Sequence, residues 1–307
     1  MRQRAPFALL LLATFGTISA VAQRGPAVPP LVRENATKKI SEHVYVIPDN
    51  NVGMVPNVGI VVGSRATLVV DTGLGARNGQ TVMKEVAKVS SNDELYLVTT
   101  HVHPEHDLGA QGFPAHTRMI RSQDQVQEIA EQGLETAKRF SGFSPLHAEL
   151  LQGAGFRKAD ITFDKEHTID LGGARVRVLA MGYNHTRGDT ATFVEPDGVL
   201  FSGDVSMSAL PAAGGNSSLA TWIASQDRFL ALKPRQVVPS HGAIIDAAAV
   251  ARNREFLMTV QARAAALKKQ GIALDAAAKT IQSELEPKFG ASPRMAGTIR
   301  TAYNEAP

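Results

Sequence analysis

Cysteine is absent from the 307 residues of the chain, and this absence excludes several kinds of chemistry. Without thiols the protein can form no disulfide, no thiolate metal site and no cysteine nucleophile. A chain of this length can bury a stable core without disulfides, so their absence is compatible with an exported protein. Any metal site must be built from histidine and carboxylate side chains.

An excess of charge of one sign is also lacking. The chain has 32 Lys and Arg residues against 29 Asp and Glu residues, which gives a net charge of +3. Such a small and dispersed excess offers no basic face to a phosphate backbone, so we expect no nucleic-acid partner. With 44% hydrophobic and 20% charged residues, the composition excludes the disordered and fibrous classes.

Long hydrophobic runs are lacking except at the N-terminus. Residues 1–22 combine Arg2 and Arg4 with an apolar run and a small-x-small sequence that ends at Ala22. This pattern predicts a secretory signal peptide cleaved after Ala22. An uncleaved membrane anchor is the alternative, but the run is short and contains polar residues. We therefore expect a periplasmic or secreted protein with no stable membrane insertion after cleavage.

The mature chain divides into a predicted flexible arm over residues 23–42, rich in proline and polar residues, and one domain over residues 43–307. Within the domain, strand and helix patterns alternate in two successive halves, which suits two sheets between helical layers. Strands are expected over 44–47, 58–62, 66–71, 95–99, 175–179, 190–194, 199–201 and 236–239. Helices are expected over 78–90, 218–231, 246–268, 273–286 and 292–303, and residues 121–152 are expected to be mainly helical.

Histidines gather directly after the predicted strands. Three of the nine lie in residues 101–106, after an apolar strand. His185 and His241 lie in turns that follow later strands, and Asp204 stands at another strand end. Because strands of one sheet can deliver their ends to a single rim, we expect these side chains to meet there.

Neutral imidazoles and carboxylate oxygens are the ligands that zinc accepts when thiolates are missing. Zinc lowers the pKa of a bound water to near 7 and so supplies hydroxide without a strong base. Seven candidate ligands exceed what one tetrahedral ion needs, which points to two ions. The predicted division gives His101, His103 and His185 to the first ion and Glu105, His106 and His241 to the second, with Asp204 bridging.

The string His101-x-His103-x-Glu105-His106, followed in order by His185, Asp204 and His241, resembles the metallo-β-lactamase superfamily. Asp71, in Val-Val-Asp-Thr-Gly, looks like the first motif of that family. The resemblance covers residues 43–245. It implies an α/β fold, the four-layer αβ/βα sandwich, with two zinc ions in a cleft along one edge of the sheets. It also gives Asp71 a supporting role behind the ligands, whereas the residues alone are equally compatible with a simple turn.

Two features separate this chain from parts of the superfamily. The family usually has Asp where this chain has Glu105, so the second ion either sits differently, binds weakly or is absent. Asp204 resembles the bridging Asp of glyoxalase II and the lactonases, whereas the true β-lactamases of this fold have Cys or Ser at that position. In an alternative interpretation, Asp204 caps the segment that follows it. The ligand string and the predicted export are also similar to periplasmic hydrolases associated with quinoprotein and sulfur-oxidation systems.

The predicted function is therefore an exported zinc-dependent hydrolase of a small-molecule substrate. Metal-bound hydroxide would attack an ester, thioester, lactone or lactam, with Asp204 and Glu105 as the catalytic carboxylates. Two alternatives remain open. One is an iron-dependent oxidoreductase similar to the persulfide dioxygenases, and the other is a non-catalytic periplasmic metal-binding protein.

Other polar residues have more ordinary interpretations. Asp107 is expected to be structural, and Asp189 is expected to lie in a solvated turn. The small-residue loop 205–218 is either a lip of the cleft or an inert connection. The remaining histidines with no predicted function are His43, His116, His147 and His167.

Overall fold

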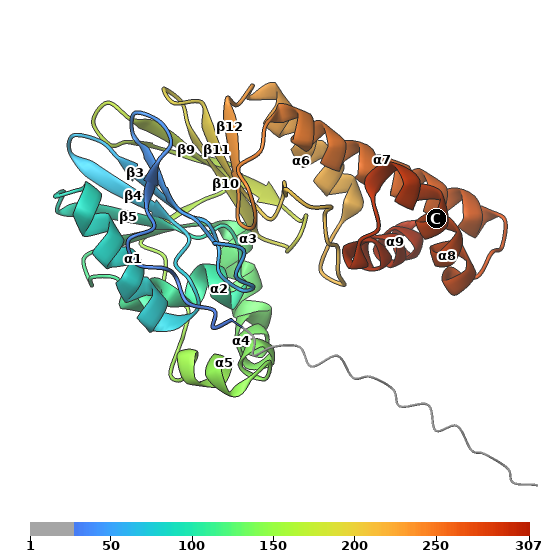
Figure 1. Cartoon of the computed structure of the whole chain (residues 1–307), viewed down its shortest axis with the longest axis horizontal. Coiled ribbons are helices and arrows are strands. Elements are labelled where there is room, and N and C mark those ends of the chain that lie inside the picture. Colours follow the sequence, from blue (N-terminus) through green and yellow to red (C-terminus); the bar gives the residue numbers. More distant parts are fainter. Residues whose placement is uncertain (1–27) are drawn as a thin grey trace, which may run out of the picture.

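The computed structural model describes residues 28–307, and its centre is a pair of sheets packed face to face (Figure 1). One sheet has the order β1-β2-β3-β4-β5-β6-β7, and the other has the order β12-β11-β10-β9-β8. Strands β1 to β4 run antiparallel and β4 to β7 run parallel, while the second sheet is antiparallel except for the β11–β12 pair.

The strands of the first sheet are β1 (Lys38–Lys39), β2 (Val44–Ile47), β3 (Val58–Val62), β4 (Ala66–Val70), β5 (Glu94–Val98), β6 (Arg118–Ser122) and β7 (Ile161–Phe163). Those of the second are β8 (Glu166–Asp170), β9 (Arg175–Gly182), β10 (Asp189–Val194), β11 (Val199–Gly203) and β12 (Gln236–Pro239). The helices are α1 (Gly75–Val89), α2 (Pro104–Asp107), η1 (Leu108–Gly112), α3 (Gln123–Glu128), η2 (Ile129–Gly133), α4 (Leu134–Ser141), α5 (Pro145–Leu150), α6 (Leu219–Ala231), α7 (Ala247–Lys269), α8 (Leu274–Phe289) and α9 (Pro293–Glu305).

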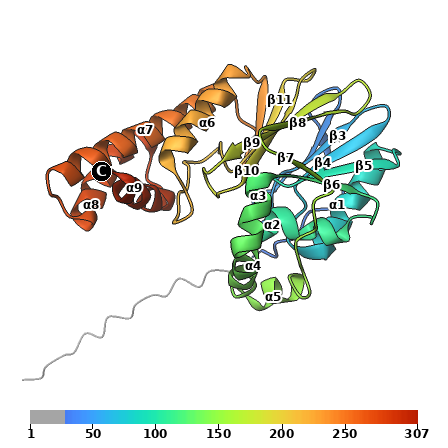
Figure 2. The ribbon, with the colours of Figure 1, turned by 180° about the vertical axis from the view of Figure 1, so that it is seen from behind.

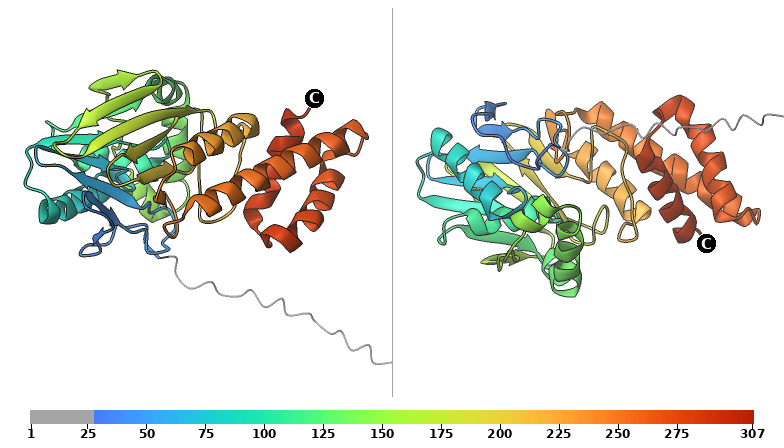
Figure 3. Two further views of the ribbon diagram at one scale, coloured as in Figure 1. Left: turned by 90° about the horizontal axis from the view of Figure 1, so that it is seen from above. Right: turned by 60° about the horizontal axis from the view of Figure 1, so that its bottom comes forward.

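Three apolar cores hold the layers together. Between the sheets, side chains such as Val70 and Val178 are fully buried. On the outer face of the first sheet, Val82 of α1 packs against the strands, and on the outer face of the second, Trp222 and Phe229 of α6 do the same. The layers α1, sheet, sheet and α6 confirm the predicted αβ/βα sandwich, which is seen from above in Figure 3.

Helices α7, α8 and α9 extend from the sandwich on the side away from α1 (Figures 1 and 2). Their own apolar contacts continue the core under α6, through residues such as Phe256 and Ile299. The loop 205–218 is fixed to this helical arm: Thr298 Oγ1 donates to Pro211 O (2.8 Å) and accepts from Ala213 N–H (3.1 Å). The loop therefore has a defined position at the junction of the sandwich and the helical arm.

The predicted flexible arm over 23–42 is packed on the domain from residue 30 onward. Val32 is buried, its N–H donates to Asn78 Oδ1 (2.7 Å), and Asn78 Nδ2 donates to Pro30 O (3.0 Å). The side-chain amide of α1 thus satisfies backbone groups of a proline-rich segment that sequence composition alone suggested to be loose. Residues 23–27 and the predicted signal peptide 1–22 lie outside the described residues. Among residues 28–307, no helix is both long and apolar enough to cross a membrane.

Candidate metal centre

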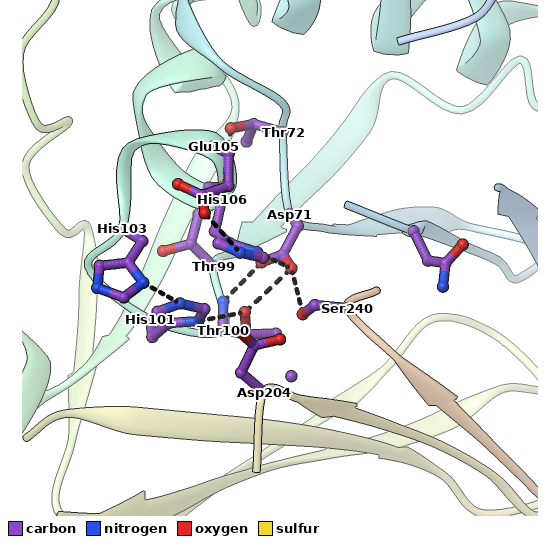
Figure 4. Close-up of polar contacts among 12 residues, drawn as sticks. Asp71, Thr72, Thr99, Thr100, His101, His103, Glu105, His106, Asp204 and Ser240 are labelled. Atoms are coloured by element: carbon purple, nitrogen blue, oxygen red, sulfur yellow. Dashed lines mark hydrogen bonds and ion pairs between the residues drawn. The ribbon is translucent and has the colours of Figure 1, made fainter. Parts of the chain in front are cut away.

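The ligand segment follows β5 directly and then turns into a short helix. His103 precedes α2, which begins at Pro104, and Pro is favoured at a first helical position because its missing N–H is not needed there. This turn places His101 before the helix and His106 within it, so that both buried rings face the space between the sheet ends (Figure 4). Close packing of α1 on η1 supports the turn from behind: a Cβ on Gly79 would lie 1.9 Å from Gly109 O.

All seven predicted ligands converge at this sheet edge. His103 Nδ1 lies 3.0 Å from His101 Nε2 and 3.3 Å from His185 Nε2. Asp204 Oδ2 lies 3.5 Å from His185 Nε2, and Glu105 Oε1 lies 3.7 Å from His106 Nε2. Three sets of donor atoms lie within 4.8 Å of one another, each set able to hold a metal ion. The sets are His101–His103–His185, His101–His106–Asp204 and Glu105–His106–His241.

The outward nitrogens of four rings are held by the protein, which leaves their Nε2 atoms facing inward. His185 Nδ1 lies 3.2 Å from Ala212 O, and His241 Nδ1 lies 3.0 Å from Val55 O. A carbonyl oxygen can only accept, so Nδ1 carries the proton and Nε2 keeps the lone pair that a metal needs. Thr100 Oγ1 donates to Asp71 Oδ2 (3.0 Å) and so accepts from His101 Nδ1 (3.1 Å), and His106 Nδ1 donates to Asp71 Oδ2 (2.9 Å).

Several buried polar atoms in the centre lack a partner in the protein. Among the described residues these atoms include Glu105 Oε2, His106 Nε2 and Asp204 Oδ1. A buried polar atom without a hydrogen bond is costly, so such a group calls for an ion or a water. The inward lone pairs and unpartnered oxygens together fit a divalent cation that accepts nitrogen and oxygen ligands.

Asp71 ties the end of β4 to the ligand segment. Its Oδ1 accepts from Thr100 N–H (2.7 Å), and its Oδ2 accepts from His106 Nδ1–H (2.9 Å) and Ser240 Oγ (3.3 Å). Its backbone has φ of 67°, a conformation uncommon for a residue with a side chain. These bonds favour the supporting role implied by the family resemblance over that of a simple turn residue.

Burial and neighbouring charges shift the pKa values of the centre in different directions. Burial, with help from the neighbouring imidazoles, holds the pKa values of His101 and His103 well below the ordinary value. Burial would also lower the pKa of His106, but the carboxylates of Asp71, Glu105 and Asp204, Asp71 first, together outweigh it and raise that pKa to about 9. Burial opposes ionisation of Asp204, yet the surrounding imidazoles, His241 first, lower its pKa to about 2.

The environment of Asp189 differs from the one predicted from the sequence. The expected solvated turn is wrong: the side chain is buried, and Oδ2 accepts from the N–H of His185 (2.7 Å) and of Thr186 (3.0 Å). Glu128 holds the next part of this turn by accepting from Gly188 N–H (2.7 Å). Burial raises the pKa of Asp189 well above its ordinary value. Two buried carboxylates therefore fix the turn that presents His185.

Three further residues near the centre, Asp204, Asp107 and Phe140, differ in their surroundings. Asp204 does not precede any described helix, so the capping alternative is not supported. Asp107 is structural, as expected, and is paired with the buried Arg121. Phe140 covers the centre, with its ring 5.3 Å from that of His103.

A cleft of about 520 Å³ opens over the centre. Its lining includes ligand residues from both sheets, residues Ser208 and Ala212 of the loop 205–218, and Arg294 of α9. The loop is thus a lip of the cleft and not an inert connection. A larger cavity of about 810 Å³ lies between the loop, α7 and α9, but none of the candidate ligands lines it.

Comparison with known families agrees with this geometry. The family model described as "Metallo-beta-lactamase superfamily" matches residues 52–241. The chain belongs to this superfamily. The match ends at His241 and leaves α7, α8 and α9 outside it. A search of curated proteins finds no match.

Several solved structures share the fold of this chain. The stereoselective inverting sec-alkylsulfatase Pisa1 from Pseudomonas sp. superposes with a TM-score of 0.71 at 14% identity, over 88% of this chain and 50% of that one. This chain therefore spans half the length of the alkylsulfatase. A metallo-β-lactamase from Pontibacter korlensis superposes with a TM-score of 0.57 at 19% identity, over 72% of this chain and 98% of its own. A metallo-β-lactamase family protein from Thermus thermophilus superposes with a TM-score of 0.59 at 23% identity, over 85% of this chain and 91% of its own.

Proposed function

We propose that this superfamily member is an exported, zinc-dependent hydrolase of small molecules that contain an ester, thioester, lactone or lactam bond. One observation carries the proposal: five imidazoles and two carboxylates converge below an open cleft, and Glu105 Oε2, His106 Nε2 and Asp204 Oδ1 among them have no partner in the described protein. Nitrogen and oxygen donors in this number suit two zinc ions better than one.

In this proposal the donor sets divide as the sequence predicts. His101, His103 and His185 would hold one ion, Glu105, His106 and His241 would hold a second, and Asp204 would lie between them. When bound, the ions would supply a water acidic enough to ionise near neutral pH and a Lewis acid for the oxygen of the scissile group.

Asp204 has the properties of a carboxylate that orients the attacking water. It is buried, its Oδ1 is unpartnered, and a pKa of about 2 keeps it ionised throughout the physiological range. An ionised carboxylate in this position accepts a hydrogen bond and aims the water at the substrate. The neighbouring Phe140 limits access of bulk solvent from one side of the cleft.

Glu105 supports a second ion despite its extra methylene. Its Oε1 lies 3.7 Å from His106 Nε2, and it forms a complete donor set with His106 and His241. Glu105 lies in the first turn of α2 and is buried. We therefore propose two ions, with Glu105 in the place where the family usually has Asp.

Purification of the mature chain, followed by elemental analysis and a substrate panel, tests the function. The panel contains esters, thioesters, lactones and lactams, together with an alkyl sulfate because an alkylsulfatase shares the fold. We expect zinc and hydrolysis in the parent protein, less zinc and no hydrolysis in His103→Ala and Asp204→Ala, and no loss of either in His167→Ala, which alters a histidine outside the centre.

The same measurements distinguish the alternatives. Bound iron with oxygen consumption would favour the oxidoreductase similar to persulfide dioxygenases. Tight zinc with no turnover on the panel would favour a non-catalytic metal-binding protein. Parent-level hydrolysis in either ligand variant would exclude the proposed centre as the site of the reaction.

Export has its own test. We propose that residues 1–22 are removed during transport, which leaves Gln23 as the first residue. Expression of the full chain in a bacterium with an outer membrane, followed by fractionation and intact-mass measurement, should place the protein in the periplasm with the mass of residues 23–307. An uncleaved chain in the membrane fraction would support the anchor instead.

A further inference from the structure

Arg294 is a cation in the cleft that the proposed chemistry does not use. It lies in the first turn of α9, where its N–H is 3.3 Å from the Ser292 hydroxyl. Its side chain is half-buried and lines the same 520 Å³ cleft as His103, Asp204 and the other ligands. The residue lies outside the segment 52–241 that matches the superfamily. The C-terminal helices therefore add a charged group to the site from beyond the segment that the family model matches.

The guanidinium of Arg294 has no carboxylate partner among residues 28–307. Within the described part of the chain, its one side-chain hydrogen bond runs from Nη1 to Met207 Sδ (3.1 Å), and a thioether is a weak acceptor. By contrast, Arg300, on the same helix, bonds to a carboxylate at 2.7 Å, and Arg177 does so at 2.8 Å. Arg294 thus keeps most of its five donors available.

The other charges of the cleft do not neutralise Arg294. Asp49 also lines the cleft, but its carboxylate accepts from Gly242 N–H (2.7 Å) and Asn51 N–H (3.1 Å). Glu105 and Asp204 belong to the ligand set. With two divalent ions bound, the positive charges exceed the three carboxylates, so the cleft attracts an anion.

The position of Arg294 is set by the fold. Thr298, one turn further along α9, bonds to both Pro211 and Ala213 of the cleft lip. Met207, on the same loop, is buried and contacts the guanidinium. A binding residue held on a helix against the rim in this way is better preorganised than one on a free loop.

We propose that Arg294 binds a carboxylate of the substrate, remote from the bond that is cleaved. This inference rests on the proposed function and narrows it to hydrolysis of anionic substrates. A guanidinium suits the task because its planar fork can donate two hydrogen bonds to one carboxylate. The substrate then spans the cleft, with its scissile bond at the ligand cluster and its carboxylate at the N-terminal end of α9.

Matched substrates test the inference by activity. One series contains 4-nitrophenyl monoesters of straight-chain dicarboxylic acids with six to nine carbons, and the other replaces the free carboxylate with a carboxamide. We expect the parent to prefer the carboxylate series, and Arg294→Gln to lower kcat/KM for that series by about 10- to 100-fold, chiefly through KM. The carboxamide series should change by less than about twofold, since a neutral group gains little from the cation.

Arg300→Gln is the matched control, because it removes an arginine from the same helix but not from the cleft. It should leave both series unchanged. Equal losses on the two series in Arg294→Gln would mean a structural effect and would overturn the inference, as would no loss on either.

A binding measurement separates this inference from the proposed function. Straight-chain dicarboxylates of six to nine carbons and matched monocarboxylates are titrated calorimetrically into the zinc-loaded protein. The parent and Arg300→Gln should bind the best dicarboxylate at least about tenfold more tightly than its monocarboxylate, and Arg294→Gln should lose that preference. If no substrate of the panel is hydrolysed but this preference is present, the proposed function fails while the carboxylate site stands. If the parent shows no preference, the site fails.

Discussion

Asp71 Oδ2 lies 2.9 Å from His106 Nδ1, and the side chains of both residues are buried. The other oxygen of Asp71 accepts from the N–H of Thr100, at the start of the ligand segment. A single carboxylate thus fixes the orientation of one candidate ligand and the backbone that leads to another. This arrangement of carboxylate behind histidine is one that tunes metal sites in general.

Replacement of Asp71 by Asn should weaken zinc binding by about 10- to 100-fold. Asn retains the size of the side chain and tolerates the positive φ, so the fold should persist. Competition with a chromophoric chelator measures the affinity. Asp197→Asn is the control, because Asp197 also pairs with a histidine, His43 (2.8 Å), but away from the centre. Equal zinc affinity in Asp71→Asn and the parent would remove the supporting role.

Zinc binding should release a proton from His106. The pKa of about 9 means that this ring is protonated at pH 7.5 in the metal-free protein, whereas ligation requires the neutral ring. The affinity should therefore fall as the pH decreases below about 9, and Asp71→Asn should reduce the dependence because it removes the anion that raises the pKa. Calorimetry in buffers of different ionisation enthalpy gives the proton count, and a count of zero at pH 7.5 contradicts this account.

Removal of the Glu105 carboxylate should cost one of the two zinc ions. In Glu105→Ala the set with His106 and His241 loses its oxygen donor, while the set of His101, His103 and His185 remains whole. Zinc per chain after dialysis should therefore fall from about two to about one. Glu149→Ala, at an exposed carboxylate near Arg77, should keep both ions. Two retained ions in Glu105→Ala would show that Glu105 is not a ligand.

Much of the fold could be predicted from the sequence because its apolar periodicity is strong. Strands β3 and β4 are nearly continuous apolar runs, and the bounds of α7 differ by one residue at each end from those predicted. Strands β1, β6, β7 and β8 were not predicted. In β6 the chain reads RMIRS, and Arg121 is buried there because Asp107, Thr99 and the carbonyl of Arg157 accept its hydrogen bonds. Strand β8 buries one residue of five and so has no apolar run.

The ligand residues could be predicted for a different reason. They are chemically unusual, clustered, and placed at strand ends, so their pattern can be recognised in the sequence. The contacts that hold these residues in place cannot be recognised there. In the sequence Asp189 resembles any aspartate in a turn, and only the packing of β10 against the turn at His185 shows its role. Arg294 follows His241 by 53 positions, and no motif surrounds it. Such roles depend on tertiary proximity, which periodicity does not encode.

Loss of the Asp107 carboxylate should destabilise the whole domain. Arg121 donates to both oxygens of Asp107, and the side chains of the two residues are at most 1% exposed. Asp107→Ala leaves a buried guanidinium without its counter-charge, which costs about 3–5 kcal/mol. Asp227→Ala, which breaks a surface pair with Arg254, should cost less than about 1 kcal/mol. Urea unfolding of the metal-free proteins measures both free energies, and similar losses in the two variants would mean that the buried pair is not needed for stability.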